Sequence, residues 1–139
     1  MAARIQSRTE AIVLRLLDYG ESDRIVTFCT ADHGKLRGIA KGARRSRRRF
    51  ANTLEPFCCS RILFSRRSPE SLALIEEAEA IDHFPAIRAE LEKTLAASYL
   101  IDLTDHFLPE DKKSPEVFSL LDAFLHLFET EPSPGEALL

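Results

Sequence analysis

The period of the hydrophobic pattern changes once along this chain, near Phe84-Pro85, and that change limits the folds open to it. Before it, apolar and polar residues alternate in short runs, as in β-strands whose successive side chains point to opposite faces. After it, apolar residues recur every three or four positions, the spacing of one face of an α-helix. We therefore predict two successive parts, a basic β domain at residues 1–81 and the start of an acidic helical domain at residues 82–139.

Alternation, β-branched residues and turn signals predict five short strands in the first part. Their connections are of hairpin length, apart from the longer stretch between the third and fourth strands. The count and the lengths suit the partly open, five-stranded barrel of the oligonucleotide-binding (OB) fold, and an SH3-like barrel fits the pattern almost as well. The strands are expected at residues 9–17, 24–30, 35–41, 57–64 and 72–81.

Two helices with wide apolar faces are predicted in the second part. A wide apolar face indicates burial against other helices, and two such helices seldom complete a core, so we expect an incomplete helical domain or a partner. The second helix should begin with Ser114 as N-cap and Pro115 at its first position. Residues 136–139 resemble the first turn of a third helix. The first helix has its stripe at Ile87, Leu91, Leu95, Tyr99, Leu103 and Phe107, and the second at Val117, Leu120, Leu121, Phe124, Leu127 and Phe128.

The two parts carry opposite charge. Residues 1–67 hold fifteen Lys and Arg against six Asp and Glu, a net charge of +9, whereas residues 68–139 hold four against sixteen, a net charge of −12. Only the first part suits a polyanion such as nucleic acid.

The positive charge is concentrated between Lys35 and Arg49, where eight of fifteen residues are basic and none is acidic. The first half alternates like a strand, and the second is too charged to pack, so we predict a strand that continues into an exposed basic loop. A solvated charge run or a localisation signal is the plainer interpretation. The sharper interpretation is a phosphate-binding surface. Glycines at 34, 38 and 42 would let the backbone of a ligand approach this surface closely.

The sequence lacks the usual catalytic and metal-binding patterns. The chain has no phosphate-binding loop, nucleophile elbow or zinc-ligand spacing, so we expect neither an enzyme nor a bound cofactor or metal. Its three cysteines, two of them adjacent, indicate reduced core residues. No signal peptide or membrane-spanning run is seen, which predicts a cytoplasmic protein.

Three segments resemble the RecO family of bacterial recombination mediators, and their order and spacing agree with that family. They are residues 19–30 (Tyr-Gly-Glu-Ser-Asp-Arg-Ile-Val-Thr-Phe-Cys-Thr), residues 34–45 (Gly-Lys-Leu-Arg-Gly-Ile-Ala-Lys-Gly-Ala-Arg-Arg) and residues 54–57 (Leu-Glu-Pro-Phe). The Lys-Gly-Ala-Arg motif, between a glycine-led strand and a basic loop, is fairly specific. The resemblance is strong over residues 9–81 and extends to the helical part only in placement and pattern.

The resemblance implies an N-terminal OB barrel followed by a helical domain, in a nucleoid-associated protein of DNA repair and recombination. The family binds single- and double-stranded DNA, anneals complementary strands, and works with RecR to help RecA replace single-stranded-DNA-binding protein, whose acidic tail it also contacts. Many members carry a cysteine zinc module farther along, which is absent from residues 1–139. Carried over by position, the DNA-binding residues are Lys35, Arg37, Lys41, Arg44, Arg45, Arg47, Arg48 and Arg49, with Arg15 and Arg24 as additions.

Bases bound by such a barrel would also stack on an aromatic side chain. Phe50 is the best candidate because it follows the arginines in a loop predicted to be exposed, and packing of Phe50 onto the barrel is an equal alternative. Two other functions stay open: an RNA- or ribosome-binding barrel, and an interaction scaffold whose arginines bind an acidic peptide.

Overall fold

The structure, a computed structural model, describes residues 4–45, 50, 53–110 and 112–132. Five strands come first: β1 (Ile5–Tyr19), β2 (Asp23–Thr30), β3 (Gly34–Ala40), β4 (Cys59–Arg66) and β5 (Ala73–Asp82). Three helices follow them: α1 (Pro85–Ala89), α2 (Leu91–Phe107) and α3 (Pro115–Thr130). The expected change from strands to helices therefore falls between Asp82 and Pro85.

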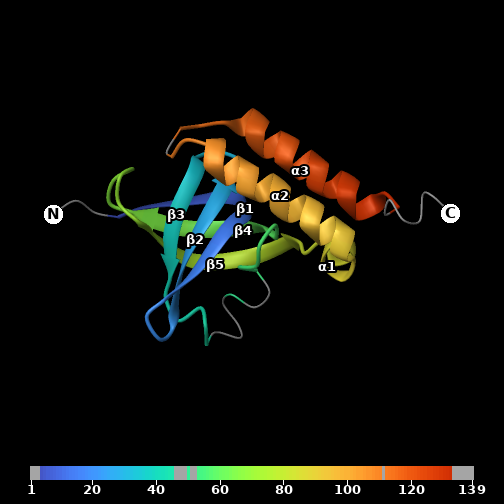
Figure 1. The fold of residues 1–139 in the computed structure, drawn as a ribbon. Coiled ribbons are helices and arrows are strands. Elements are labelled where there is room, and N and C mark those ends of the chain that lie inside the picture. Colours follow the sequence, from blue (N-terminus) through green and yellow to red (C-terminus); the bar gives the residue numbers. More distant parts are fainter. Residues whose placement is uncertain (1–3, 46–49, 51–52, 111, 133–139) are drawn as a thin grey trace.

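The strands form a mixed sheet that closes on itself in the order β1-β2-β3-β5-β4. All neighbours are antiparallel except β3 and β5, which run parallel where Gly38 lies opposite Ala73. A five-stranded closed sheet followed by helices is consistent with the predicted OB-type fold. Figure 1 shows the sheet with α2 and α3 lying across one side.

Strand β1 closes the barrel because it is long enough to pair on both edges. Its first half pairs with β4 from Ile5 to Ile12, and its second half pairs with β2 from Ala11 to Tyr19. The register with β2 shifts between Val13 and Arg15, so the strand bends there, as bulged strands do at the corners of small barrels. The sequence placed this strand at residues 9–17 and missed its extension, since Ile5–Arg8 is too polar to signal a strand.

Alternate residues of β1 enter two different cores. Ala11 and Val13 face the barrel interior with Phe28, Leu36 and Phe64. Their neighbours Ile12 and Leu14 point outward and are buried beneath the helices. This second core combines strand and loop residues with residues from every helix. Its buried members are Ile12, Leu14, Cys29, Phe57, Cys59, Phe84, Ile87, Ala97, Ile101, Leu108, Phe118, Leu121 and Leu125.

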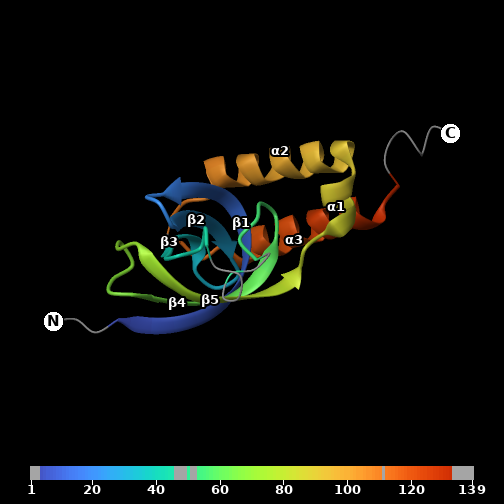
Figure 2. The ribbon, with the colours of Figure 1, turned by 90° about the horizontal axis from the view of Figure 1, so that it is seen from below.

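Helices α2 and α3 lie side by side against the barrel, as Figures 1 and 2 both show. One continuous helix was predicted across Ile87–Phe107, but Glu90 is extended (φ −113°, ψ 119°) and separates α1 from α2. Ser114 occupies the predicted N-cap position of α3, with Pro115 next, although its hydroxyl donates to the carbonyl of Lys112 instead of capping the helix. Residues 136–139 lie outside the described part of the chain.

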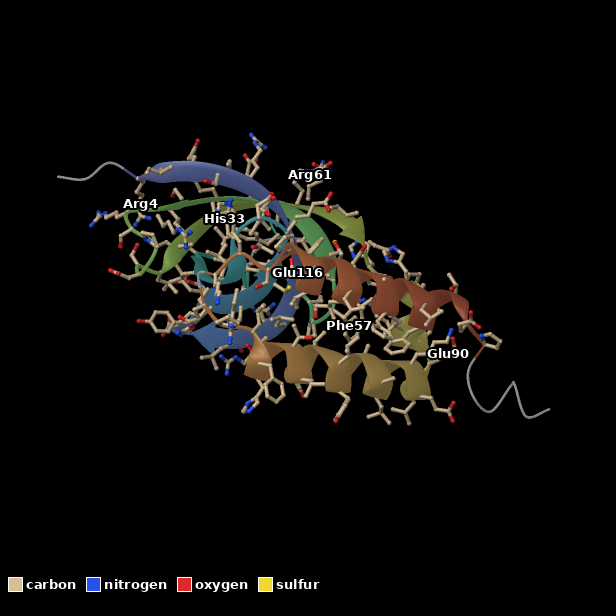
Figure 3. All side chains as sticks on the ribbon, turned by 90° about the horizontal axis from the view of Figure 1, so that it is seen from above. Arg4, His33, Phe57, Arg61, Glu90 and Glu116 are labelled. Atoms are coloured by element: carbon tan, nitrogen blue, oxygen red, sulfur yellow. The ribbon has the colours of Figure 1, made fainter. Side chains whose placement is uncertain are left out.

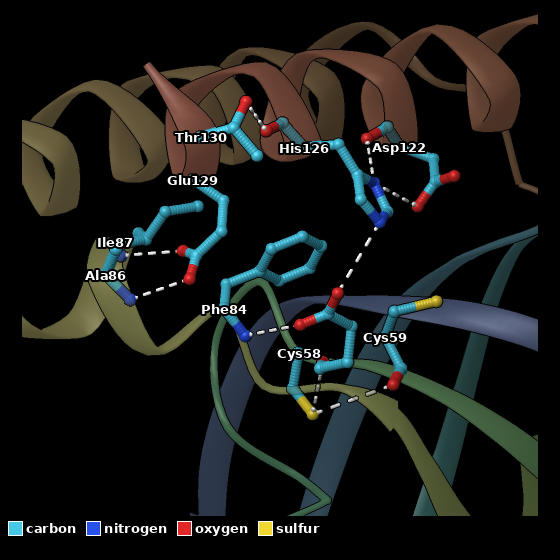
Figure 4. Close-up of polar contacts among 10 residues, drawn as sticks. Cys58, Cys59, Phe84, Ala86, Ile87, Asp122, His126, Glu129 and Thr130 are labelled. Carbon is cyan, nitrogen blue, oxygen red and sulfur yellow. Dashed lines mark hydrogen bonds and ion pairs between the residues drawn. The ribbon is translucent and has the colours of Figure 1, made fainter. Parts of the chain in front are cut away.

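Glu129 of α3 fixes the short helix α1. Its two carboxylate oxygens accept hydrogen bonds from the backbone N–H groups of Ala86 (2.7 Å) and Ile87 (2.9 Å), as Figure 4 shows. These N–H groups belong to the first turn of α1, where no intrahelical acceptor exists. The contact joins the first helix of the chain to the last one.

Candidate nucleic-acid interface

The basic loop begins where β3 ends at Ala40. Lys41 to Arg45 form a tight turn in which Gly42 has a positive φ of 72°, a conformation that glycine adopts without steric cost. The Gly42 N–H donates to the Asp23 carboxylate at 2.8 Å. The turn is therefore held at a fixed position beside the start of β2.

Arg44 fastens this turn to the turn between β1 and β2. Its backbone N–H donates to Ser22 O (3.0 Å), and its guanidinium donates to Gly20 O (2.9 Å). The Nε of Arg44 also lies 3.6 Å from Asp18 Oδ2, and the Nε of Arg24 lies 3.3 Å from the other oxygen, Asp18 Oδ1. The two turns thus form one surface, on which Asp18 offsets part of the charge of both arginines.

Lys41 and Arg45 lie exposed at the same end of the barrel. Within the described residues, the side chain of Arg45 makes no hydrogen bond or ion pair. It is therefore the clearest of these cations for contact with an external anion. Arg47, Arg48 and Arg49, predicted for the same loop, lie outside the residues that the structure describes.

Lys35, at the opposite end of β3, forms an ion pair with a residue of α2. Its Nζ lies 2.9 Å from Asp105 Oδ1 and donates to the Asp105 backbone carbonyl at 2.7 Å. The Lys35 side chain is only 13% exposed. Arg15, on β1, contributes to the same cluster, with its Nε 3.6 Å from Asp105 Oδ2.

Arg37 has a weaker contact of the same kind, 3.8 Å from Glu110, and both side chains are about half exposed. The predicted continuous basic surface is therefore corrected. Acids of α2 and of the segment after it balance the strand half of the stretch, and the loop half stands apart from them. The sequence could not show this, because these acids lie about 70 residues farther along the chain.

Two of the three glycines expected to admit a ligand instead admit other parts of this chain. A Cβ at Gly34 would lie 2.0 Å from Lys112 O, and one at Gly38 would lie 2.5 Å from the Ile75 side chain. Only at Gly42 would a Cβ meet open space.

Phe50 packs onto the barrel, the second of the two alternatives given for it, so its prediction as an exposed stacking platform is wrong and the alternative is confirmed. Phe50 is 5% exposed and belongs to the barrel core, together with Ala43 and Leu54. Burying a large ring is favoured over leaving it in a solvated loop. Tyr19 is the aromatic residue that lies near the basic turn and is accessible, at 54% exposure. The sequence placed Tyr19 in a turn, whereas it ends β1, next to Gly20, whose carbonyl accepts the hydrogen bond from Arg44.

Other basic side chains lie elsewhere on the barrel, outside the predicted set. Arg61 is 3.9 Å from Glu10, and Arg66 stacks over the ring of Phe64. Arg37 and Arg66 line a surface cavity of about 300 Å³ beside the β4–β5 loop, which Glu110 also lines. This cavity is mixed in charge, with Arg37 and Arg66 facing Glu70 and Glu110.

The cysteines are reduced and buried, as expected. Burial raises the pKa of Cys29 and of Cys59 to about 12, and it also raises the pKa of Cys58. Such thiols are poor nucleophiles and poor metal ligands. In the described part of the chain, no group of three potential metal-ligating side chains comes together. Nor does any helix among these residues have the length and apolar character needed to span a bilayer.

The fold and this surface define a class: a small β-barrel with a basic turn at one end and an acidic helical layer on one side. Comparison with protein families assigns the two parts of the chain to one family. Residues 1–84 match the family described as Recombination protein O N terminal, and residues 88–139 match Recombination protein O C terminal. The chain belongs to the Recombination protein O (RecO) family, in agreement with the resemblance of its sequence motifs.

Bacterial relatives share the chain over nearly all of its length. It is 53% identical to "DNA repair protein RecO" of Syntrophus aciditrophicus over 139 residues, which is 100% of this chain and 53% of the relative. It is 45% identical to the protein of the same name from Geobacter metallireducens, over 94% of this chain and 53% of that relative. The chain thus spans about half the length of the curated relatives it matches.

Proposed function

We propose that this chain is a non-catalytic DNA-binding module of DNA repair, and that the turn at Lys41–Arg45 forms the centre of its interface. The observation that carries the proposal is the fixed position of this turn. Arg44 and Gly42 attach it to the neighbouring turn, while Arg45 remains directed at solvent. A rigid cationic surface loses less conformational entropy on binding than a mobile tail does.

Phosphate contacts from Lys and Arg supply most of the affinity of non-specific DNA binding. Tyr19, beside the turn, offers a ring on which an unpaired base can stack, which favours single strands. Arg24 and Arg44 add positive charge, part of which Asp18 offsets. Lys35, Arg37 and Arg15 stabilise the helical layer in this proposal and contribute little to DNA affinity.

The wider role that we propose follows the family: annealing of complementary strands, and assistance to RecA together with RecR in the cytoplasm, at single strands covered by single-stranded-DNA-binding protein. The chain supplies the DNA-binding step of this sequence. Annealing can be measured by fluorescence with labelled complementary oligonucleotides. Acceleration that disappears in the Arg45→Ala variant would support the link between binding and annealing.

A competition assay tests the proposed function. The chain is bound to a labelled single-stranded DNA of about 20 nucleotides and challenged with unlabelled DNA, RNA of the same sequence, or an acidic peptide. We expect DNA to compete best, and Tyr19→Leu to weaken DNA binding more than it weakens peptide binding. Preference for RNA would assign the barrel to RNA instead, and efficient competition by the peptide alone would indicate a protein-interaction scaffold.

A further inference from the structure

The N-terminal half of β1 has an edge to which no other strand is paired. Residues 5–12 pair with β4 on one side, but the pairing with β2 on the other side begins only at Ala11. Within the described residues, no strand therefore covers residues 5–9 on this second side. Figures 2 and 3 view the molecule from opposite directions, and both show this half of β1 at the margin of the barrel with no element beyond it.

The backbone groups that point to this open edge belong to Gln6 and Arg8. The carbonyl of Glu10 faces the β2 side, because it accepts a hydrogen bond from the Ala31 N–H at 2.9 Å. Successive residues of a strand direct their N–H and C=O groups to alternate edges, and the register with β4 is regular over residues 5–12. The N–H and C=O groups of Gln6 and Arg8 thus have no partner among the described residues, and both residues are exposed. Such an edge is a template for another strand.

A second copy of the same strand fits this edge in one antiparallel register. Gln6 opposite Gln6 would bring Arg4 opposite Arg8, and Arg8 opposite Arg8 would place like charges directly together, so both registers are disfavoured. Gln6 opposite Arg8 avoids these repulsions and brings Arg4 opposite Glu10 on each side of a twofold axis at Ser7. Each Gln6–Arg8 pair exchanges two hydrogen bonds, which satisfies all of the open backbone groups.

The side chains along this edge are accessible for such a contact. Glu10 lies 3.9 Å from Arg61, in a pair whose two side chains are 48% and 52% exposed. Arg4 donates a long hydrogen bond to Ser65 O, at 3.4 Å. Ile5 is 69% exposed, and in the proposed register the second copy's Thr9 would lie opposite Ile5 and cover part of it.

We propose that residues 4–10 form a self-association surface, at which two copies of this chain pair as antiparallel β1 strands about a twofold axis at Ser7. The partner is a second copy because the order of charges along the strand is complementary to itself. The paired strands join the sheets of two barrels into one. The interface is small, so the dimer is weak. This proposal is independent of where DNA binds.

A cross-link tests the register. Ser7 faces its own copy in a non-hydrogen-bonded pair, whose Cα atoms lie about 4.5 Å apart, within the range that a disulfide spans. We expect Ser7→Cys to form a disulfide-linked dimer in a buffer of oxidised and reduced glutathione. Ile5→Cys is the matched control: Ile5 is the more exposed residue, but its Cα atoms would lie about 13 Å apart, so it should not cross-link. The three natural cysteines are buried and should not react.

Sedimentation velocity measures the association without a cross-link, at chain concentrations from about 10 µM to about 1 mM. Gln6→Pro removes an N–H from the open edge and none from the pairing with β4, so the fold should persist and the dimer should be lost. Gln6→Ala, which keeps the N–H, should associate as the parent does.

The charges give a further control. Arg4→Glu or Glu10→Arg alone places like charges opposite one another and should weaken the dimer roughly tenfold, and the two substitutions together should restore it. The proposal is overturned if Ser7→Cys cross-links no faster than Ile5→Cys, if Gln6→Pro associates as Gln6→Ala does, or if the charge exchange restores nothing. A chain that stays monomeric up to about 1 mM would leave this edge to a strand of another protein, and would also overturn the proposal.

Discussion

Asp105 pairs with Lys35, the first cation of the basic segment, and holds its side chain inside the molecule. Its carboxylate and its backbone carbonyl both contact Lys35, whose side chain is 13% exposed, and the same carboxylate faces Arg15. A lysine in this position needs its partner, because removal of the carboxylate leaves a poorly solvated ammonium. A residue of the helical layer therefore occupies the ammonium group of Lys35, whereas Arg15 remains 61% exposed beside it.

Replacement of Asp105 by Asn should destabilise the protein. The amide preserves the shape but not the charge, so we expect a loss of about 1–2 kcal/mol in the free energy of unfolding, measured with urea. Glu110→Gln is the matched control, because its pair with Arg37 is about half exposed. The control should cost less than about 0.5 kcal/mol. Equal losses in both variants would show that Asp105 has no special role in joining the helices to the barrel.

The cysteines predict a dependence of stability on high pH. Burial raises the folded pKa of Cys29 and Cys59 to about 12 from an ordinary value of 9.0, so the folded state favours the neutral thiols. Their contribution to stability should be complete below pH 9 and should be lost as the pH rises from 9 to about 12, because the unfolded thiols ionise first.

Thiol chemistry gives a second readout of this burial. At pH 8, a thiol of pKa near 12 has about one molecule in ten thousand ionised, so a disulfide reagent should react far more slowly with the folded chain than with the chain in urea. Rapid reaction of all three cysteines in the folded chain would contradict their placement in the core.

At the scale of elements, the hairpin between β2 and β3 makes a close backbone contact with the segment between α2 and α3. Gly34 has a φ of +66°, and the backbone of Lys112, in the segment between α2 and α3, lies directly against it. Lys35 and Glu110 form a parallel bridge beside this contact. One backbone position therefore governs both the hairpin and the attachment of the helical layer.

Gly34→Ala should destabilise the protein more than Gly20→Ala does. Both residues have nearly the same positive φ, and thus a similar conformational cost of about 1 kcal/mol. A methyl at Gly20 meets nothing within 4 Å, whereas a methyl at Gly34 collides with Lys112 O. We expect a further loss of at least about 1 kcal/mol for Gly34→Ala, measured by urea unfolding. Equal losses would mean that the segment at Lys112 moves aside freely.

The elements themselves were largely predictable, because their signals are local. Alternation located all five strands, and Pro115 located the start of α3. The sequence placed the start of β4 two residues early, since Phe57 takes a left-handed conformation (φ 57°) and so cannot belong to the strand. The period of α2 showed which residues share a face, but it could not show which face meets the barrel: the small Ala97 allows close approach there, and the larger stripe from Leu91 to Phe107 remains outside.

Only the loop half of the candidate site was predictable, because only its signal is local in the sequence. The basic turn is a local feature of residues 41–45, and the sequence identified it. The pairing of Lys35 with Asp105 and the burial of Phe50 depend on the packing of distant segments. A list of basic residues therefore could not show that cations of the strand half are paired with acids of the helical part.

At the scale of the whole molecule, the barrel and the helices jointly form the second of the two cores, the one outside the barrel. Ile12 and Leu14 of β1 are buried only because α2 and α3 cover them, and Phe118 and Leu121 of α3 are buried on the same core. This arrangement couples the stability of the two parts. It also leaves the helices without an inner partner when the barrel is removed.

A fragment of residues 82–139 should therefore aggregate or remain partly unfolded. Without the barrel, both faces of α2 are exposed, and open apolar faces of this size drive association. Circular dichroism and analytical ultracentrifugation would measure this, with the chain of residues 1–139 as the control. A monomeric fragment with a sharp thermal transition would show that the helices form a core of their own.

The central claim, that the turn at Lys41–Arg45 holds DNA through phosphates, is tested most directly by salt. If about five cations of the basic loop engage single-stranded DNA, log K should fall against log[salt] with a slope of roughly −3.5, from about −0.7 for each contact. The double variant Lys41→Ala/Arg45→Ala should flatten this slope by about 1.4 and weaken binding similarly for all sequences. The variant Lys112→Ala/Lys113→Ala changes the net charge equally at the other end of β3, and it should retain nearly the parental slope. A parental slope in the first variant, or equal flattening in both, would contradict the account.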